Sequence, residues 1–405
     1  MAYSFPTAFS ARAEKISDFL GSRIFPVGLF LLLTGMFWIG RHGLYPKVFY
    51  WAVLLPAVLS MICSPGRIRQ LASSPVFLAF LAFSCYMTMA SLWSESEKSV
   101  IDLIKLPLFV LSLFYFVFEL GRQRFDLLIA TTKWAAVFAV AAGLYTLTEF
   151  FRSGANNRLS GYGALYNPLL VSHVFGFFLA WWLGIYFSRR QLFEPLTLVM
   201  IPVLLALLLA TGSRTPLLAM TATIFWLAAI VRNRKAALIV AALALAAAAI
   251  LLLAPEIFTQ RGSSYRTEIW ANALRQISEA PWFGHGFDTP IRIWVEGIPY
   301  PFWEPHNFTL TVLLEGGICA GLLWLALYLA ALRESWRWRA DPWVMACSAT
   351  VVYGLMAGMT EGGSAFARPK EHWFLIWIPL TLAAAAIQQA KAANAIGQET
   401  VGANG

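Results

Sequence analysis

The sequence predicts an all-α integral membrane protein of about twelve spanning helices, and three observations carry that prediction. Of its 405 residues, 59% are hydrophobic and only 13% are charged, and the mean hydropathy of +0.66 is too apolar for a soluble domain. Apolar runs long enough to cross the bilayer core follow one another along the chain. These runs lack the alternation of barrel strands, and helices alone satisfy their own backbone groups in lipid.

The apolar runs define one polytopic membrane domain over residues 1–405. The first run begins after residue 23 and another follows at once, so we expect a start-transfer helix rather than a cleaved signal peptide. The predicted spans are residues 24–40, 45–63, 75–93, 101–119, 127–150, 166–187, 192–210, 216–231, 236–254, 306–332, 341–360 and 371–389.

The distribution of basic residues predicts the orientation. Of the 30 lysines and arginines, seventeen lie in or beside one set of loops and thirteen in the other, four of these in one long segment where the rule is weak. Both termini are therefore expected in the cytoplasm. The net charge of +9 suits the anionic headgroups of membrane lipids, and we do not interpret it as nucleic-acid binding.

One connection, residues 255–305 between the ninth and tenth spans, is long and is predicted to be external. It is too rich in tryptophan, tyrosine and phenylalanine for a disordered linker. Ile269, Trp270, Ala273, Leu274 and Ile277 fall at helical spacing, which predicts an amphipathic helix against the membrane surface. The remainder suggests an irregular cap or lid, and a functionless aromatic belt is the alternative.

Two arginines near outer helix ends are candidates for binding phosphate groups. Arg214 lies beside Ser213, and Pro216 and Thr215 suit the first helical position and the N-cap of the next span. A helix N-terminus beside an arginine favours a bound phosphate, although such an arginine can equally snorkel to a headgroup. Arg266, in the first turn of the predicted amphipathic helix, has the same two interpretations.

The sequence Glu304-Pro305-His306-Asn307 opens the tenth span at the outer boundary. A histidine has an ordinary pKa near neutrality, which makes His306 a candidate general base, although a histidine at a membrane boundary is often only a satisfied polar residue. The other histidines and the four cysteines show no metal-ligand spacing, so neither a metal nor another cofactor is predicted. Any bound pyrophosphate would then be neutralised by arginines.

Three further polar residues near outer span ends are weaker candidates: Arg158, Arg368 and Glu315. Glu315 lies within the tenth span, where an ionised carboxylate is costly and therefore a candidate for function. A hydrogen bond between helices is the alternative explanation for Glu315.

The order of these motifs resembles the O-antigen ligase family, part of a superfamily of membrane enzymes that polymerise or ligate bacterial surface polysaccharides. The resemblance rests on these segments, in order: Ser213-Arg214-Thr215, Arg266 through Trp270, Pro281 through Gly286, His306-Asn307 and Glu315-Gly316-Gly317. It is strongest over residues 205–325, and the topology extends it over the chain. In the family pattern a further Gly, Thr or Tyr stands at the position of residue 320, but this chain has Ala320, and Gly321 comes one position late.

The resemblance implies a GT-C-like glycosyltransferase in the bacterial inner membrane, with its active site facing the periplasm. The implied donor is an O-antigen glycan on undecaprenyl pyrophosphate, and the implied acceptor is a sugar hydroxyl of lipid A-core. His306 would act as general base, and Arg214 and Arg266 would bind the pyrophosphate in an inverting transfer without a metal. Ser213, Arg158, Asn307, Glu315 and Arg368 would support this site.

Several alternatives stay open at this stage. Within the superfamily, the chain could be a polysaccharide polymerase or a ligase that glycosylates a protein such as pilin. A flippase or transporter of lipid-linked glycans is an alternative from another class, for which the sequence shows no convincing internal repeat. A scaffolding membrane protein would make the ordered arginines and histidine a coincidence.

Overall fold

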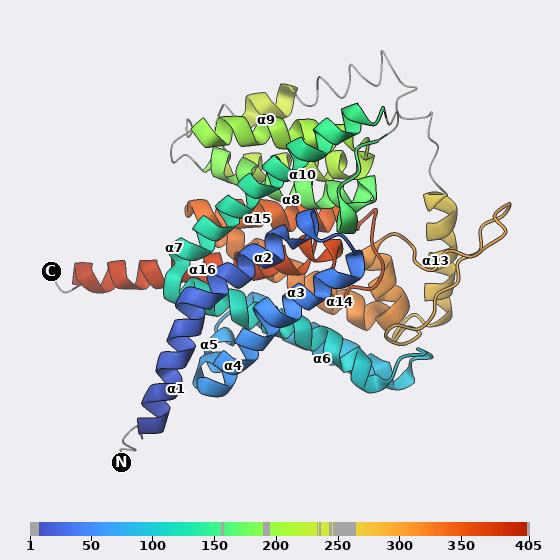
Figure 1. Ribbon diagram of the computed structural model, residues 1–405. Coiled ribbons are helices and arrows are strands. Elements are labelled where there is room, and N and C mark those ends of the chain that lie inside the picture. Colours follow the sequence, from blue (N-terminus) through green and yellow to red (C-terminus); the bar gives the residue numbers. More distant parts are fainter. Residues whose placement is uncertain are drawn as a thin grey trace.

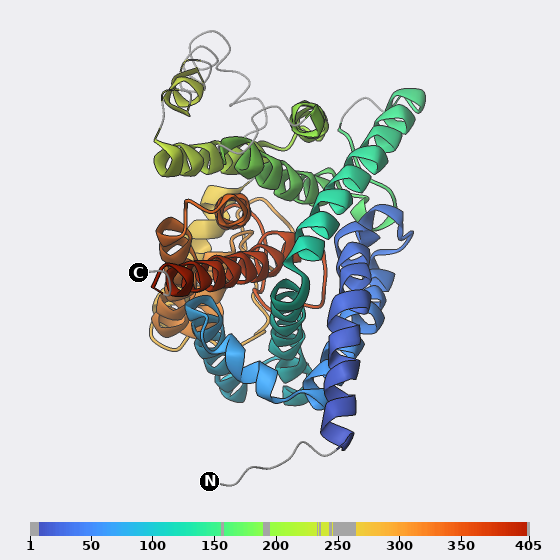
Figure 2. The same cartoon turned by 90° about the vertical axis from the view of Figure 1, so that its left-hand side faces the viewer.

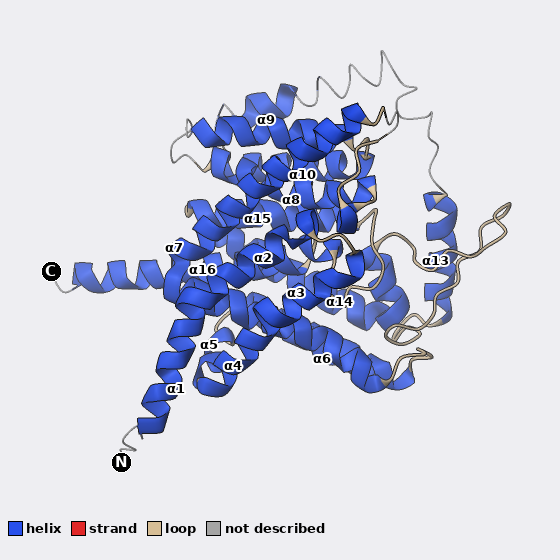
Figure 3. Ribbon diagram, viewed as in Figure 1, coloured by secondary structure: helices blue, strands red, loops and turns tan. Residues whose placement is uncertain are grey.

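The described part of this computed structural model is helical throughout, with loops between the helices (Figure 3). It covers residues 8–154, 158–188, 195–232, 234, 236–242, 245 and 265–402. Within those residues the extended structure is limited to one antiparallel bridge between Ile293 and Phe302. The prediction of an all-α protein is confirmed for this part of the chain.

The helices are named as in Figure 1. Their bounds are α1 Ala8–Phe19, α2 Phe25–Trp38, α3 Tyr45–Phe49, α4 Leu55–Cys63, α5 Gly66–Leu71, α6 Pro75–Ala90, α7 Val100–Arg152, α8 Pro168–Phe187, α9 Pro195–Ala210, α10 Arg214–Val231, α13 Arg266–Glu279, α14 Phe308–Arg337, α15 Pro342–Gly358 and α16 Trp377–Gly402.

Several of these helices begin with a capping residue followed by proline. At the start of α8, Asn167 precedes Pro168 and accepts a hydrogen bond from the Leu169 amide. At the start of α15, Asp341 precedes Pro342 and accepts from two amides of the first turn. The side-chain oxygen satisfies a free N–H and proline removes one, so the sequence itself sets these boundaries.

Among the described residues, eight helical segments are long and apolar enough to cross a membrane, and α9 and α15 are shorter apolar helices. Helix α7 contains the predicted spans 101–119 and 127–150, and the non-helical backbone at Arg124 divides its 53 residues into two helices that meet at a kink between these spans. The predicted span 236–254 and residues 255–264 lie largely outside the described residues. The helical membrane architecture is confirmed, and the number twelve stays a prediction.

The helices pack into one large apolar core. Helix α8 packs on α15, which also contacts α10 and α16, while α2 packs on α7 and α14 on α6 (Figure 2). Between α15 and α16 the chain runs through a buried segment, residues 361–376, which we call the buried outer loop. Gly354 of α15 lets this loop approach, because a Cβ there would lie 1.8 Å from the Leu375 carbonyl oxygen.

Helix α13 lies across one end of this assembly, transverse to α8, α10 and α15, whereas α1 and the C-terminal end of α16 lie on the opposite side (Figure 1). The predicted helix over 269–277 is therefore confirmed, with bounds Arg266–Glu279. Its buried residues, Ile269 and Ala273, pack against Leu314 of α14 and the segment around Ile293. The apolar face was predicted to lie against the membrane surface, but these two residues cover protein instead.

Candidate active site

His306 lies just before the start of α14, at the end of the molecule that carries α13. Asn307 is the N-cap of α14, and its side chain accepts a hydrogen bond from the Leu310 amide, so its first role is structural. His306 precedes it with φ of 51°, in the left-handed region, at a cost of about 1–2 kcal/mol. Trp270 of α13 holds this segment by donating its indole N–H to the Pro305 carbonyl at 3.0 Å. Such strain at a defined residue is common in functional sites.

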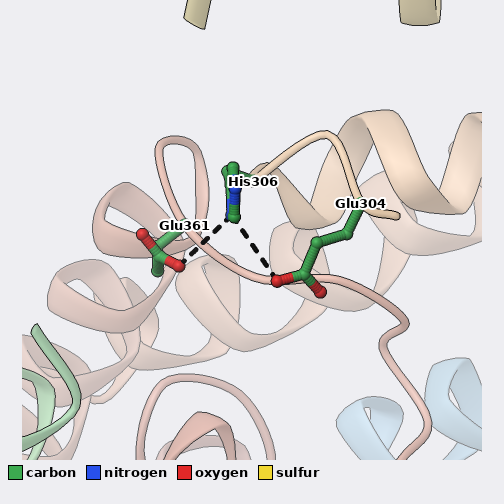
Figure 4. Close-up of side chains that lie close together, drawn as sticks. All are labelled: Glu304, His306 and Glu361. Atoms are coloured by element: carbon green, nitrogen blue, oxygen red, sulfur yellow. Dashed lines mark ion pairs between the residues drawn. The ribbon is translucent and has the colours of Figure 1, made fainter. Parts of the chain in front are cut away.

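The His306 imidazole lies between two carboxylates (Figure 4). Its Nδ1 is 3.5 Å from Glu304 Oε1 and 3.6 Å from Glu361 Oε1, slightly longer than a hydrogen bond. The Nδ1 atom is buried, although the side chain as a whole is 32% exposed. The accessible part of the ring is therefore the part away from Nδ1, and Nε2 is the nitrogen that can meet a substrate.

Glu361 joins His306 to Arg266. The Arg266 Nη2 donates to Glu361 Oε2 at 3.3 Å, while Glu361 itself is only 8% exposed. The interaction with Glu361 raises the pKa of the His306 imidazole above its ordinary value, against the opposing effect of burial. Burial alone would raise the pKa of the Glu361 carboxyl, but His306 and neighbouring imidazoles outweigh it, so the net shift is downward.

The start of α10 is tied to the same place through two threonines. The Thr360 hydroxyl donates to the Thr215 hydroxyl at 3.1 Å, which sets the residue after Arg214 against the residue before Glu361. Arg214 is exposed at the first position of α10. We predicted Thr215 as the N-cap, which is wrong: Ser213 is the N-cap and the helix begins one residue before Thr215.

Arg158 fixes the turn that precedes α10. Its Nε donates to the Thr211 carbonyl and its Nη2 to the Ser213 hydroxyl, both at 2.8 Å. Ser213 itself makes no side-chain hydrogen bond to the α10 amides. The pair Arg158 and Ser213 therefore acts here as a brace that positions the helix end carrying Arg214.

Glu315 lies near a break in α14. Gly317 has φ of 64°, and the helix there exchanges hydrogen bonds with the loop at 281–286. The Gly286 amide donates to the Glu315 carbonyl at 2.9 Å, and the Ile318 amide donates to the Pro281 carbonyl at 2.8 Å. A side chain at Gly317 would collide with the Trp282 backbone. This exchange explains why the loop motif and the Glu315-Gly316-Gly317 motif occur together.

The Glu315 carboxylate is 2% exposed and accepts a hydrogen bond from Ser364 of the buried outer loop at 3.3 Å. The sequence suggested a hydrogen bond between helices as the alternative to a direct role for Glu315. The contact with Ser364 is a hydrogen bond of that kind, made to a loop instead of a helix. Arg368 is exposed on the same loop, where its charge interacts with Asp102 at the start of α7. The contacts of Arg368 thus place it at the rim, apart from the His306–Glu361 pair.

The donor atoms of Glu304, His306 and Glu361 lie within 4.8 Å of one another, a spacing that a divalent cation could bridge. The same arrangement also suits an imidazolium held between two carboxylates, with Arg266 supplying further positive charge. The absence of a metal stays a prediction.

Two carboxylates of the site escaped the sequence reasoning. Glu304 was part of the recognised motif but was given no role, and Glu361 was not noticed. Glu361 lies 55 positions after His306, in the connection between α15 and α16, and only its neighbours Gly362 and Gly363 distinguish it locally. A carboxylate beside two glycines in an outer connection is the signal that could have found it.

Comparison with known proteins decides the family. A family model described as O-antigen ligase matches residues 196–325. The chain is also 46% identical, over 396 residues, to a curated protein of Pseudomonas aeruginosa named O-antigen ligase, a match that covers 97% of this chain and 98% of that one. The chain belongs to the O-antigen ligase family. The resemblance seen in the sequence is confirmed.

The two matches cover the site differently. The O-antigen ligase model spans Arg214, Arg266, His306 and Glu315, but it ends before Glu361 and Arg368. The match to the Pseudomonas aeruginosa ligase extends over nearly the whole chain. The carboxylate that joins Arg266 to His306 therefore lies outside the segment by which the family model recognises this chain.

Proposed function

We propose that this protein is an O-antigen ligase that transfers a polysaccharide from undecaprenyl pyrophosphate to a sugar hydroxyl of lipid A-core. The observation that carries the proposal is the His306–Glu361–Arg266 cluster in a chain related over nearly its full length to an O-antigen ligase. In this cluster His306 is the base, Glu361 is the carboxylate that orients it, and Arg266 is the cation that can bind a phosphate group.

His306 acts as the general base in this proposal. Its Nε2 takes the proton of the acceptor hydroxyl while the hydroxyl oxygen attacks the anomeric carbon of the donor glycan. The bond from that carbon to the pyrophosphate oxygen breaks, and its electron pair leaves with the lipid pyrophosphate. A single displacement inverts the anomeric centre. Glu361 and Glu304 stabilise the imidazolium that forms, because both carboxylates face Nδ1.

Arg266 and Arg214 receive the pyrophosphate and stabilise the charge that develops as it leaves. The amides at the start of α10 add the positive end of a helix dipole. Arg266 is held by Glu361 at 3.3 Å before donor binds, a contact weak enough to be exchanged for a phosphate oxygen. Donor binding then frees Glu361 to act on His306, which couples donor capture to base activation. With two arginines in this role the reaction needs no metal.

The proposed reaction also accounts for the position of the cluster at one end of the helical assembly. Both substrates are anchored in the membrane by lipid, so their sugars meet only at its surface. We propose that this surface is the periplasmic face of the inner membrane and that both termini are cytoplasmic. The α13 segment, residues 265–305 in the described chain, covers that face.

The test uses full-length protein in vesicles with lipid-linked O-antigen and purified lipid A-core. His306→Ala is expected to reduce transfer by roughly 10²–10⁴-fold while donor affinity stays close to that of the unsubstituted protein. The matched control is His285→Ala, whose imidazole instead bonds to the Gln276 carbonyl. Near-normal transfer by His306→Ala would refute the role of His306.

Polymerisation of the glycan and transfer to pilin remain the alternatives within the superfamily, because the donor half of the site would be the same. The name of the Pseudomonas aeruginosa relative, O-antigen ligase, favours ligation. Supplying lipid A-core, lipid-linked repeat units or pilin in parallel assays separates the three. A lipid-linked glycan flippase would translocate donor without joining it to any acceptor.

A further inference from the structure

A short hairpin after α13 presents a face that has no role in the mechanism above. Ile293 and Phe302 pair through two backbone hydrogen bonds of 2.9 Å, and we call residues 291–303 the outer hairpin. Because successive side chains of an extended strand point to opposite faces, one face of the hairpin is covered and the other is open. Ile293 is fully buried against α13, whereas its neighbours Arg292 and Trp294 are exposed.

The open face combines two indole rings with a positive charge. Trp294 is 56% exposed and Trp303 is 63% exposed. The guanidinium carbon of Arg292 lies 5.7 Å from the centre of the Trp303 ring, a cation–π contact across the hairpin. Among the described residues, no carboxylate lies within ion-pair distance of Arg292. The face therefore offers apolar ring surfaces beside a cation that no acidic side chain neutralises.

A second exposed aromatic pair in the same connection, Trp282 and Phe283, has a different setting. The Trp282 carbonyl accepts a hydrogen bond from the Cys319 amide of α14 at 3.2 Å, which places this pair beside the exposed apolar face of that helix. The exposed apolar residues of α14 recur at helical spacing: Ile318, Leu322, Leu325 and Leu329. Such a face suits lipid, and aromatic residues beside it suit the membrane interface. The chain after α13 instead reaches farther from the helical assembly than α13 itself (Figure 1). An interfacial belt therefore accounts for Trp282 and leaves the outer hairpin unexplained.

The outer hairpin runs directly into the proposed base. Trp303 is three positions before His306, so their Cα atoms are at most about 11 Å apart. Phe302, on the covered face of the hairpin, packs edge-on against the His306 ring with 6.3 Å between the ring centres. The open face thus begins within the reach of a short oligosaccharide whose end lies at His306.

The hairpin is also displaced from the arginine that is proposed to bind pyrophosphate. Asn272 of α13 donates to the Trp294 carbonyl at 3.2 Å, and Gln276 donates to the Arg292 carbonyl at 3.0 Å. These two residues follow Arg266 by six and ten positions, which is about 9 and 15 Å along the helix axis. In an inverting displacement the acceptor hydroxyl attacks from the side opposite the leaving group. A surface that continues from the base away from Arg266 therefore lies on the acceptor side.

We propose that the open face of the outer hairpin binds the oligosaccharide of the acceptor, an inference that rests on the function proposed above. Trp294 and Trp303 stack on the faces of its sugar rings, because the C–H groups on those faces meet the negative face of an aromatic ring. Arg292 pairs with acidic groups that the oligosaccharide carries. The hairpin thereby selects the acceptor and directs one of its hydroxyl groups to His306, and it takes no part in the chemical step.

The test measures binding of core oligosaccharide, released from its lipid by mild acid, to full-length protein in nanodiscs by calorimetry. Trp294→Ala and Trp303→Ala are each expected to weaken binding roughly tenfold, whereas Trp303→Tyr keeps an aromatic face and should bind nearly normally. With intact substrates the KM for lipid A-core should rise by the same factor, while kcat and the donor KM stay unchanged. The matched control is Trp282→Ala, because Trp282 is 62% exposed and lies outside the hairpin.

Substitution of Arg292 tests the acidic character of the ligand. Arg292→Gln is expected to weaken binding of the same oligosaccharide roughly fivefold at low ionic strength and less at high ionic strength, because salt screens the lost interaction. Arg292→Lys keeps the charge and should retain most of the affinity. An unchanged affinity in Arg292→Gln would contradict the pairing with acidic groups.

The outcomes separate this inference from the function on which it rests. If the tryptophan variants raise the KM for lipid A-core but bind the lipid-free oligosaccharide normally, the face contacts the membrane and the inference is overturned. It is also overturned if they weaken binding of lipid-free donor glycan instead, or if Trp282→Ala has the same effect. The ligase proposal survives all three results. If the unsubstituted protein transfers no glycan to lipid A-core, the proposed function itself fails.

Discussion

The two ends of the helical assembly each contain a cluster of arginines and carboxylates, and the clusters differ in how completely their charges are paired. At the end away from α13, Glu119 is fully buried and accepts from Arg67 and Arg122, while Arg67 also binds Asp18 at 2.7 Å. At the α13 end, the contacts of Glu361 with Arg266 and His306 are 3.3 and 3.6 Å long. The tightly paired cluster joins helices, and we propose that the loosely paired one exchanges partners with a ligand.

Removing the arginine from the loosely paired cluster is expected to have the largest effect on transfer. Arg266→Ala is expected to reduce transfer by about 10²–10³-fold and to weaken donor binding, because it removes a cation from the leaving group. Transfer rates and donor affinity in vesicles measure both effects. Arg275→Ala, on an exposed position of the same helix, is the matched control and should behave like the unsubstituted protein. Equal effects of the two substitutions would contradict the assignment.

The tightly paired cluster should respond in stability instead. Glu119→Ala leaves Arg67 and Arg122 without their buried partner and is expected to cost about 3–5 kcal/mol. Thermal unfolding in detergent measures this loss, and transfer per folded molecule should remain close to normal. A Glu119→Ala variant that keeps its stability but loses transfer would show that the end away from α13 takes part in the reaction.

The pH dependence of transfer tests the cluster around His306. His306 must be neutral to act as a base, and Glu361 raises its pKa, so transfer is expected to fall as pH drops through a value above the ordinary 6.5. In Glu361→Gln the stabilising carboxylate is lost, and the midpoint should move to lower pH. A pH–rate profile of the two proteins checks the direction. A midpoint that stays fixed would mean that His306 is not the titrating group.

The smallest expected effect is that of metal removal. If Arg266 and Arg214 neutralise the pyrophosphate, EDTA should leave the transfer rate unchanged. Loss of transfer that is restored by added Mg²⁺ would show instead that the donor atoms of Glu304, His306 and Glu361 hold a cation.

The sequence predicted those features that local composition determines. Apolar runs predicted the long apolar helices but not α1 or α5, and the spacing of Ile269 and Ala273 predicted α13. The charged residues around Arg124 separate the two predicted spans 101–119 and 127–150, and the structure has non-helical backbone and a kink at that residue. The hydrogen bond from Arg158 to the N-cap residue Ser213 could not be predicted, because the two residues are distant in sequence.

The candidate site was only half accessible to sequence reasoning. His306, Arg266 and Arg214 were identified because each lies beside a recognisable helix start. Glu361 was missed because its significance comes from tertiary contacts: the buried outer loop returns to the start of α14, and the two glycines after Glu361 are the one local sign of that return. The same loop brings Glu371 to His42, across 329 positions of sequence.

A structure of the His306→Ala variant with a lipid-linked pyrophosphate donor tests the central claim most directly, because this variant should bind donor without consuming it. The account predicts that the pyrophosphate contacts Arg266 and Arg214, that Arg266 has left Glu361, and that the anomeric carbon faces position 306. A pyrophosphate bound away from both arginines, or an anomeric carbon turned away from position 306, would contradict it.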